Sequence, residues 1–297
     1  MNREQFSTFF AKLENCIWTL DNTVKGITGS SMARIKRNKK YNNSASGVCF
    51  ILGTGPSLKL ESRLDELSNY PVFTVNQFYR SELFNVVKPD YHVMIDPLFF
   101  NLDPNKPEDA DTLNRIINVV ECKKVKMIFP IDVVEYLEKN IGQTDDCIFV
   151  KGRYMLHDGY NREIRIDNYI PANRNVVLTA IEIAIAIGYK TIVILGCDMT
   201  GLLDNYVKRS PSRNIESFSH VYEYTEAEKK RMQKVHAMYS NEYMLKGFYL
   251  MFREYRILYE YCKKRNIVLL NASQETALDM LPFVSLDDVL DELEGVK

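Results

Sequence analysis

The feature that most constrains the fold is an apolar helix followed almost at once by an apolar strand. Residues 175–187 (NVVLTAIEIAIAI) are apolar over a helical length, and Gly188 follows as a helix stop. Residues 191–198 (TIVILGCD) then form a largely apolar run rich in β-branched side chains. Such a run is typical of a central strand of a parallel sheet, which is buried on both faces. Together the two segments predict the second half of a βαβ unit.

Six further segments have the character of strands. They are GVCFILGTGPSL, PVFTVNQF, DYHVMIDP, VKMIFPID, DCIFVK and, near the C-terminus, NIVLLNAS. A helical stretch of roughly residues 225–264 precedes the last of them. Strands that alternate with helices predict an α/β fold with one doubly wound, mostly parallel, Rossmann-like sheet. We expect a single catalytic domain over residues 47–297.

Residues 1–46 have a different character and predict an N-terminal extension. Apolar side chains at three- and four-residue steps predict an amphipathic helix, and a basic run and a polar tract after it predict a solvated linker. The helix packs on the domain or on a second subunit, or it makes a peripheral contact with an anionic membrane surface. The apolar positions are Phe6, Phe9, Phe10, Leu13, Ile17 and Leu20, and the basic ones are Arg34, Lys36, Arg37, Lys39 and Lys40.

Composition excludes several classes of partner and site. The chain has 297 residues and a net charge of −1, so nucleic acid is not an expected partner. Its six cysteines are scattered without a C-x-x-C pair, which argues against a zinc site and a thioredoxin motif. No apolar stretch reaches the ~18 residues of a membrane span, and the N-terminus lacks the apolar core of a signal peptide. We therefore expect a cytoplasmic protein, either free or peripheral at the inner face of the membrane.

Polar residues gather at the ends of four predicted strands. In open parallel sheets, ligands bind beyond the carboxyl ends of the strands, where the strand order reverses. The first strand runs into a glycine-rich turn that suits a phosphate or a base, and the second ends in two amides that suit a nucleobase or ribose. The strand-end residues are Gly53, Thr54, Gly55, Pro56 and Ser57, then Asn76 and Gln77, then Asp96, and finally Asp198 and Thr200.

Two common nucleotide fingerprints are absent. The third glycine of G-x-G-x-x-G is missing, and Asn76 stands where a ribose-binding acidic residue would be expected, so NAD binding is not predicted. The P-loop pattern G-x-x-x-x-G-K-[ST] is also absent.

The motifs I-L-G-T-G-P-S-L, V-N-Q-F-Y and G-Y-K-T-I-V-I-L-G-C-D, followed by F-S-H, resemble the bacterial sialyltransferases of glycosyltransferase family 42. The motifs P-D-Y-H-V-M-I-D-P, R-N-V-V-L-T-A and I-V-L-L-N-A-S resemble the family of archaeal 6-hydroxymethylpterin diphosphokinase and the motility-accessory proteins. Together the two resemblances cover about residues 48–285. The first implies a GT-A-like fold and a CMP-activated sugar without an essential metal. The second implies a nucleotide phosphate, with Asp96 able to hold a metal.

The resemblance also implies roles for residues. The glycine-rich turn, Asn76 and Gln77 would hold the nucleotide, and Asp96, Asn175, Asp198 and Thr200 complete that set. The sialyltransferases place the leaving phosphate on two tyrosines and use a histidine as base. Tyr206 matches one tyrosine, whereas Thr200 stands at the position of the other. Tyr224 stands at the position of the catalytic histidine, and His220 lies four residues before it.

The chemistry of transfer favours His220 as the base. An acceptor hydroxyl must lose its proton as the new bond forms, and a group with a pKa near neutrality is suited to accept it. Among the four histidines, His220 follows a long basic stretch that reads as a lid over an anionic substrate, with Arg209 and Arg213 as its anion-binding side chains. The predicted catalytic residues are therefore His220, Tyr206 and Tyr224.

These observations predict a glycosyltransferase. It would move an acidic, sialic-acid-like sugar from a CMP-activated donor to a glycan or glycolipid acceptor in bacterial surface polysaccharide or lipopolysaccharide synthesis, with no cofactor and no metal site. One alternative is an ATP- and magnesium-dependent pyrophosphokinase of the 6-hydroxymethylpterin type. The other is a non-catalytic nucleotide-binding protein. A homo-oligomer stays open.

Overall fold

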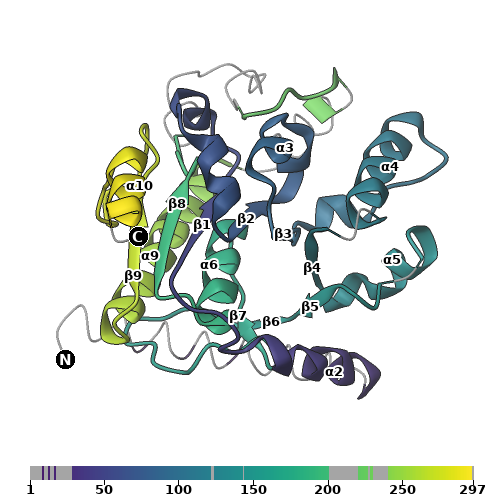
Figure 1. Ribbon diagram of the computed structural model, residues 1–297. Coiled ribbons are helices and arrows are strands. Elements are labelled where there is room, and N and C mark those ends of the chain that lie inside the picture. Colours follow the sequence, from purple (N-terminus) through teal and green to yellow (C-terminus); the bar gives the residue numbers. More distant parts are fainter. Residues whose placement is uncertain are drawn as a thin grey trace.

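The computed structural model describes residues 29–121, 124–142, 144–200, 220–226, 228–229 and 240–295, together with Phe9, Leu13 and Ile17 (Figure 1). The strands are β1 (Val48–Leu52), β2 (Val72–Val75), β3 (Tyr91–Val93), β4 (Lys126–Pro130), β5 (Ile148–Val150), β6 (Gly152–Tyr154), β7 (Ile170–Pro171), β8 (Thr191–Leu195) and β9 (Val268–Asn271). The α-helices are α2 (Gly29–Lys36), α3 (Leu83–Val87), α4 (Pro107–Glu121), α5 (Val134–Asn140), α6 (Val176–Ile187), α9 (Asn241–Lys264) and α10 (Leu286–Gly295). The 3-10 helices are η1 (Arg37–Tyr41), η2 (Pro56–Leu60), η3 (Leu64–Asn69), η4 (Asn76–Arg80), η5 (Pro97–Phe100) and η6 (Ile131–Val133).

The main sheet has seven strands in the order β5-β4-β3-β2-β1-β8-β9, and every ladder in it is parallel. The chain builds outward from β1 to β5 on one side and then returns to pair β8 with β1, with Phe50 opposite Val193. The strand order therefore reverses between β1 and β8. The predicted doubly wound parallel α/β fold is confirmed, and the reversal lies beside the glycine-rich turn.

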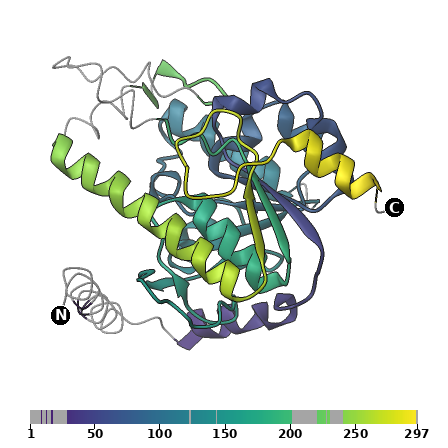
Figure 2. The same ribbon diagram turned by 90° about the vertical axis from the view of Figure 1, so that its left-hand side faces the viewer.

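Both faces of the sheet are covered, as the apolar strands predict. Alternate residues of β1 enter different cores: Cys49 and Ile51 pack with α6 and α9, whereas Phe50 and Leu52 pack with η2, η3 and α10. Figure 2 shows α6 and α9 on one side of the strands and α10 on the other. A two-sided sheet of this kind leaves only its carboxyl edge open to form a site.

Helix α6 runs along the middle of the sheet and is buried over nearly its whole length. The Asn175 side chain accepts a hydrogen bond from the Val177 backbone amide at its start, and Gly188, at φ 119°, ends it in a left-handed conformation that favours glycine. Glu182 on this helix is fully buried, and within the described part of the chain neither of its carboxyl oxygens has a hydrogen-bond partner. Burial raises the pKa of Glu182 well above its ordinary value.

The N-terminal region differs from the expected solvated linker. Ile35 of α2 is fully buried among side chains that include Met94 and Phe100. The Asn38 side chain donates hydrogen bonds to the carbonyl oxygens of Phe149 at 2.7 Å and Ile166 at 2.8 Å. The basic run therefore carries residues that dock on the domain, and the fold extends back to residue 29 rather than beginning at 47.

Three residues of the predicted amphipathic helix are described. Phe9, Leu13 and Ile17 are helical and 54%, 46% and 61% exposed. Within the described part of the chain, no helix is both long enough and apolar enough to cross a bilayer.

The predicted helix at 225–264 is interrupted at Ser240, and Glu226, Glu228 and Lys229 before the interruption are also helical. Helix α9 begins at Asn241, because Ser240 has extended dihedral angles and its side chain accepts a hydrogen bond from the Tyr243 amide. Residues 220–225 form an irregular segment (Figure 1). That segment lies above the carboxyl ends of the strands, at the opposite end of the sheet from α2.

Candidate functional site

A cavity of about 280 Å³ opens at the carboxyl ends of β1 and β8, where the strand order reverses. This is the position at which open parallel sheets bind ligands. Its described lining comes from six parts of the chain: Gly53, Thr54, Gly55 and Pro56; Val75 and Asn76; Asn175, Val176 and Val177; Gly196, Cys197, Asp198, Met199 and Thr200; His220; and Phe248, Met251 and Tyr255. Eight of the predicted nucleotide-binding residues are among them, as is the predicted base.

The two glycines of the β1 turn allow two chain segments to approach each other. A Cβ atom on Gly53 would collide with the carbonyl oxygen of Gly196. The Gly55 amide donates a hydrogen bond to the same oxygen at 2.8 Å, and a Cβ on Gly55 would lie 2.5 Å from the Asp198 carboxylate. The structural need for glycine here is thus contact between the β1 and β8 turns, whereas the sequence suggested close approach to a ligand.

Asp198 fastens these two turns together. Its carboxylate accepts hydrogen bonds from the Ser57 amide at 2.9 Å and from the Ser57 hydroxyl. Burial raises the pKa of Asp198, although the two Ser57 hydrogen bonds act in the opposite direction. Ser57 is itself buried and does not line the cavity, so its hydroxyl supports the turn through Asp198.

Asn76 presents a free acceptor at the cavity. Its φ of 48° is left-handed, a conformation that asparagine tolerates better than most residues. His92 holds the Asn76 backbone, because its Nε2 lies 2.8 Å from the Asn76 carbonyl oxygen and its Nδ1 lies 2.7 Å from the Thr74 hydroxyl. Burial lowers the pKa of His92 to about 4, so the ring is neutral. The Asn76 side-chain oxygen is buried and has no hydrogen-bond partner among the described residues, which leaves it available to a ligand donor.

Gln77 and Asp96 have local partners instead. The Gln77 amide donates to Glu228 at 3.2 Å and accepts from Arg80 at 2.7 Å. The Asp96 carboxylate caps η5 by accepting a hydrogen bond from the Leu98 amide. Neither residue lines the cavity. Adjacent amides in the sequence thus have different surroundings, since η4 begins at Asn76 and turns Gln77 into the protein.

Helix α6 begins at the cavity wall. Asn175, Val176 and Val177 all line the cavity, so the amino terminus of this 12-residue helix is directed at it. Unpaired backbone amides and the helix dipole give such an end a partial positive charge of about half a unit, which favours phosphate or carboxylate.

One wall of the cavity comes from α9. Phe248, Met251 and Tyr255 recur at helical spacing on the face that lines it, and the Tyr255 hydroxyl lies 3.3 Å from Asn175 Oδ1. None of these three residues is among the site residues predicted from the sequence. Their spacing is visible in the sequence, but it is the spacing of any core-facing helix, and no nearby polar motif marks it.

Among the described residues, the hydrogen-bond partners of His220 all lie at one ring nitrogen, Nδ1. Its Nδ1 lies 3.2 Å from the Thr54 carbonyl oxygen and 3.1 Å from the Thr54 hydroxyl. A carbonyl oxygen only accepts, so Nδ1 carries the hydrogen and Nε2 retains its lone pair. Burial lowers the pKa of His220, and the nearby Arg80 acts in the same direction. A neutral imidazole at the cavity wall can accept a proton.

Tyr224 supports His220 from the side. Its ring packs edge-on against the imidazole at 5.2 Å, and it does not line the cavity. Burial raises the pKa of Tyr224 to about 12, so its hydroxyl stays protonated near neutral pH. His157 also lies away from the cavity, with its Nδ1 3.0 Å from the Asp158 carbonyl oxygen. The predictions for Tyr206, Arg209 and Arg213 fall outside the described residues.

Within the described ranges, no three His, Cys, Asp or Glu side chains gather in a way that could hold a metal ion. The cavity lining likewise includes no lysine or arginine from those ranges.

Comparisons with known proteins give one family and several structures. A family model described as 6-hydroxymethylpterin diphosphokinase MptE-like matches residues 19–201. A search of curated proteins finds no match.

Among solved structures, the chain is similar to the MAf glycosyltransferase of Magnetospirillum magneticum AMB-1, with 15% identity, a TM-score of 0.45 and coverage of 90% of this chain. It spans 41% of the length of that protein. It is also similar to the sialyltransferase CstII of Campylobacter jejuni in complex with CMP-3FNeuAc, with 16% identity and a TM-score of 0.45 over 79% of this chain and 85% of that one.

The comparisons therefore confirm both of the resemblances seen in the motifs. Because the family model matches more than half of its length, the chain belongs to the 6-hydroxymethylpterin diphosphokinase MptE-like family.

Proposed function

We propose that this protein is a glycosyltransferase that moves an acidic sugar from a CMP-activated donor to a glycan acceptor. The observation that carries the proposal is the placement of His220. His220 lines the same cavity as the β1 turn, Asn76 and the start of α6, and its Nε2 has no hydrogen-bond partner among the described residues. A proton acceptor beside an anion-binding helix terminus is the pairing that transfer to a hydroxyl requires.

The residues fit the steps of such a transfer. The donor phosphate would lie at the start of α6, and the Asn76 side-chain oxygen would accept a hydrogen bond from the nucleotide. As the acceptor oxygen bonds to the anomeric carbon, the bond from that carbon to the phosphate breaks and CMP leaves. The acceptor proton passes to His220 Nε2. Tyr224 is a poor alternative base, because its pKa is raised to about 12.

Family membership supports a second candidate, an ATP- and magnesium-dependent pyrophosphokinase acting on a pterin-like alcohol. The same histidine would take the proton of that alcohol. The two candidates differ in the nucleotide and in the need for a metal, so ligand binding separates them.

The acceptor is proposed to be a bacterial surface polysaccharide or lipopolysaccharide. Phe9, Leu13 and Ile17 are four residues apart on a helix, and all three are exposed. A row of exposed apolar side chains at that spacing suits an interfacial helix, which would place the enzyme at a membrane surface where a lipid-linked acceptor is found.

A thermal-shift panel of CMP, CDP, UDP and ATP, with and without magnesium, tests the nucleotide. A ligand at 100 times its dissociation constant stabilises the fold by about 2.7 kcal/mol. Stabilisation by CMP without a metal supports the glycosyltransferase. Stabilisation by ATP only with magnesium refutes it in favour of the pyrophosphokinase, and no response to any nucleotide refutes both.

Removal of the imidazole tests the base. His220→Gln should lower the turnover of a CMP-activated sialic acid by about 10²- to 10⁴-fold, with CMP affinity unchanged. His157→Gln is the matched control, because His157 lies outside the cavity. Near-normal turnover in His220→Gln would show that another group is the base.

A further inference from the structure

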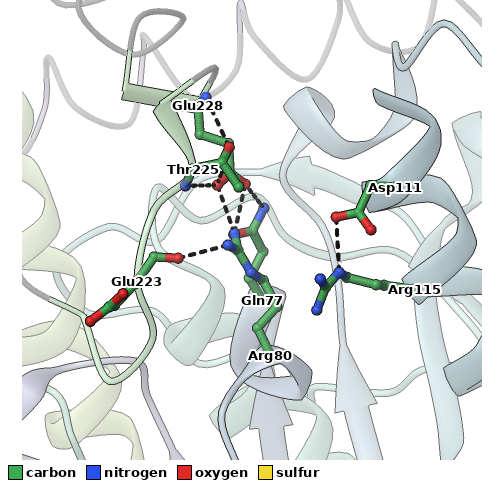
Figure 3. A network of polar contacts seen from close by, with 7 residues as sticks. All are labelled: Gln77, Arg80, Asp111, Arg115, Glu223, Thr225 and Glu228. Atoms are coloured by element: carbon green, nitrogen blue, oxygen red, sulfur yellow. Dashed lines mark hydrogen bonds and ion pairs between the residues drawn. The ribbon is translucent and has the colours of Figure 1, made fainter. Parts of the chain in front are cut away.

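The segment that carries His220 is fastened to the end of β2 by one arginine. Arg80, the last residue of η4, places Nη1 2.7 and 2.8 Å from the two carboxylate oxygens of Glu228. Its Nη2 donates to the Glu223 carbonyl oxygen at 2.6 Å. Figure 3 shows these contacts converging on one guanidinium. The Arg80 and Glu228 side chains are only 12% and 7% exposed, so this is a largely buried ion pair.

Glu228 is fixed from other directions as well. It accepts hydrogen bonds from the Thr225 amide at 2.8 Å, the Thr225 hydroxyl at 3.1 Å and the Gln77 amide at 3.2 Å. Burial acts to raise the pKa of Glu228, but the hydrogen bonds from Arg80 and Thr225 outweigh it and the pKa is lowered. The carboxylate is therefore charged, and its position does not depend on Arg80 alone.

Arg80 also begins a stack that ends at His220. The guanidinium lies 5.0 Å from the centroid of the Tyr222 ring, a cation–π contact. The Tyr222 ring in turn stacks on the His220 imidazole, with 5.1 Å between the ring centroids and an interplanar angle of 10°. Together with the contact of Nδ1 to Thr54, the stack determines the plane of the imidazole and the direction of Nε2.

We propose that Arg80 and Tyr222 are positioning residues for His220. Tyr222 stacks on the imidazole and Arg80 packs on the Tyr222 ring, and together they orient His220 toward the bound substrate. The inference rests on the proposed role of His220 as the base. If the stack had only a structural role, its loss would lower the stability of the fold but would leave the titration of His220 and the turnover of the enzyme unchanged.

The charges around the imidazole agree with this assignment. The Arg80 cation favours the neutral ring and lowers the pKa of His220, in the same direction as burial. The Glu228 carboxylate offsets part of the Arg80 charge. Tyr222 and Tyr224 are neutral because burial raises their pKa values. Among the described residues, the carboxylate that lines the cavity is that of Asp198.

Four variants separate the stack from general stability. Tyr222→Leu removes the ring, and Tyr222→Phe keeps it. Arg80→Gln combined with Glu228→Gln removes both charges without leaving one of them buried and unpaired. The matched control is Arg115→Gln combined with Asp111→Asn, a nearby ion pair on α4 whose side chains are 51% and 57% exposed (Figure 3).

Two measurements are made on each full-length variant. The titration of the His220 imidazole is followed by NMR, with its signal assigned from a His220→Gln sample. The release of CMP from CMP-N-acetylneuraminic acid is followed at saturating donor, and CMP affinity is measured separately.

Tyr222→Leu and the Arg80/Glu228 double variant should raise the titration midpoint of His220 and slow CMP release about tenfold or more, with CMP affinity unchanged. Tyr222→Phe and the Arg115/Asp111 control should behave as the wild type.

The positioning role is overturned if Tyr222→Leu keeps the wild-type midpoint and rate, or if Tyr222→Phe loses as much as Tyr222→Leu. Should the Arg80/Glu228 variant fail to fold, the two Tyr222 variants decide the question. A wild-type protein that releases no CMP, while the midpoint still moves in Tyr222→Leu, would refute the proposed function and leave the stacking on His220 supported.

Discussion

Substitution of Gly55 by alanine tests the contact between the β1 and β8 turns. Gly55 has a φ of −66° and a ψ of 147°, an extended conformation that any residue adopts, so backbone strain contributes nothing to the expected effect. The added Cβ would instead lie 2.5 to 2.6 Å from three atoms of the Asp198 carboxylate. Because that carboxylate is held by the Ser57 amide and hydroxyl, it can move only by giving up those hydrogen bonds.

The expected cost follows from the two hydrogen bonds. A hydrogen bond to a charged group contributes about 1.5–3 kcal/mol, so losing both would lower the free energy of unfolding by roughly 3–6 kcal/mol. In an Asp198→Ala background the obstacle is gone. There Gly55→Ala should be neutral, or should stabilise by about 0.4–1 kcal/mol because alanine restricts the unfolded chain.

Chemical denaturation of the wild type, both single variants and the double variant gives the coupling energy between the two sites. We expect a coupling of about 3 kcal/mol or more, together with weaker CMP binding in Gly55→Ala. Gly247→Ala is the control: a Cβ there meets no atom of the described residues within 4 Å, and alanine in place of glycine inside α9 should stabilise the fold by up to about 1 kcal/mol. If Gly55→Ala is as stable as the wild type when Asp198 is present, the proposed contact between the turns is not what requires glycine.

Three further predictions concern other parts of the fold. The raised pKa of Glu182 means that its contribution to stability is fully present below the unfolded pKa and is lost as pH rises through the folded pKa, so Glu182→Gln should remove that alkaline loss in urea denaturation from about pH 5 to pH 9. Burial lowers the pKa of His92 to about 4 in the folded state, against about 6.5 when unfolded. The free energy of unfolding of the wild type should therefore fall by roughly 3 kcal/mol as pH is lowered from 6.5 to 4, and His92→Gln should remove this dependence on pH. Deletion of residues 1–28 should lower binding to anionic liposomes without changing CMP affinity, whereas deletion of residues 1–46 should unfold the domain because Ile35 is buried. An unchanged curve in either point variant, or unchanged liposome binding in the shorter deletion, would contradict the corresponding explanation.

The arrangement of the sheet could be predicted because its strands are buried on both faces. Continuous apolar runs such as residues 191–195 identify parallel strands without any knowledge of their partners. Their carboxyl ends must then share one edge, so the sequence alone predicts that the β1 turn and Asp198 lie together. The same principle does not give the contacts made at that edge. A G-x-G pattern is equally suited to approach by a ligand and to approach by another turn, and only the position of Asp198 distinguishes them.

The error at the N-terminus has a related origin. Basic residues at Arg34, Lys36 and Arg37 suggest a solvated segment, since charged side chains are mostly exposed. The segment nevertheless docks through Ile35 and Asn38, the residues between those charges. A single apolar residue and one amide in a basic run are too few to predict a packed helix from periodicity.

The ion pair between Arg80 and Glu228 could not be predicted from the sequence, because the two residues are 148 positions apart and neither lies in a local motif. The sequence therefore led to His220 as the proposed base but not to the residues that contact it. Long-range ion pairs of this kind form only in the folded protein. In the sequence, each of the two charged residues looks like an ordinary exposed residue.

The electrostatics of the cavity bear on which nucleotide it suits. In the described ranges, its fixed positive potential comes from the start of α6, which supplies about half a unit charge, and from backbone amides, while Asp198 is turned toward Ser57. A CMP-activated sugar has a single phosphodiester charge beside the nucleotide, which a source of that size can balance. A triphosphate concentrates several charges at one place and would require further cations, from a divalent metal or from the basic stretch that includes Arg209 and Arg213. Under the proposed function we therefore favour a CMP-activated sugar as the donor, and a diphosphokinase reaction at the same cavity would require cations beyond the described lining.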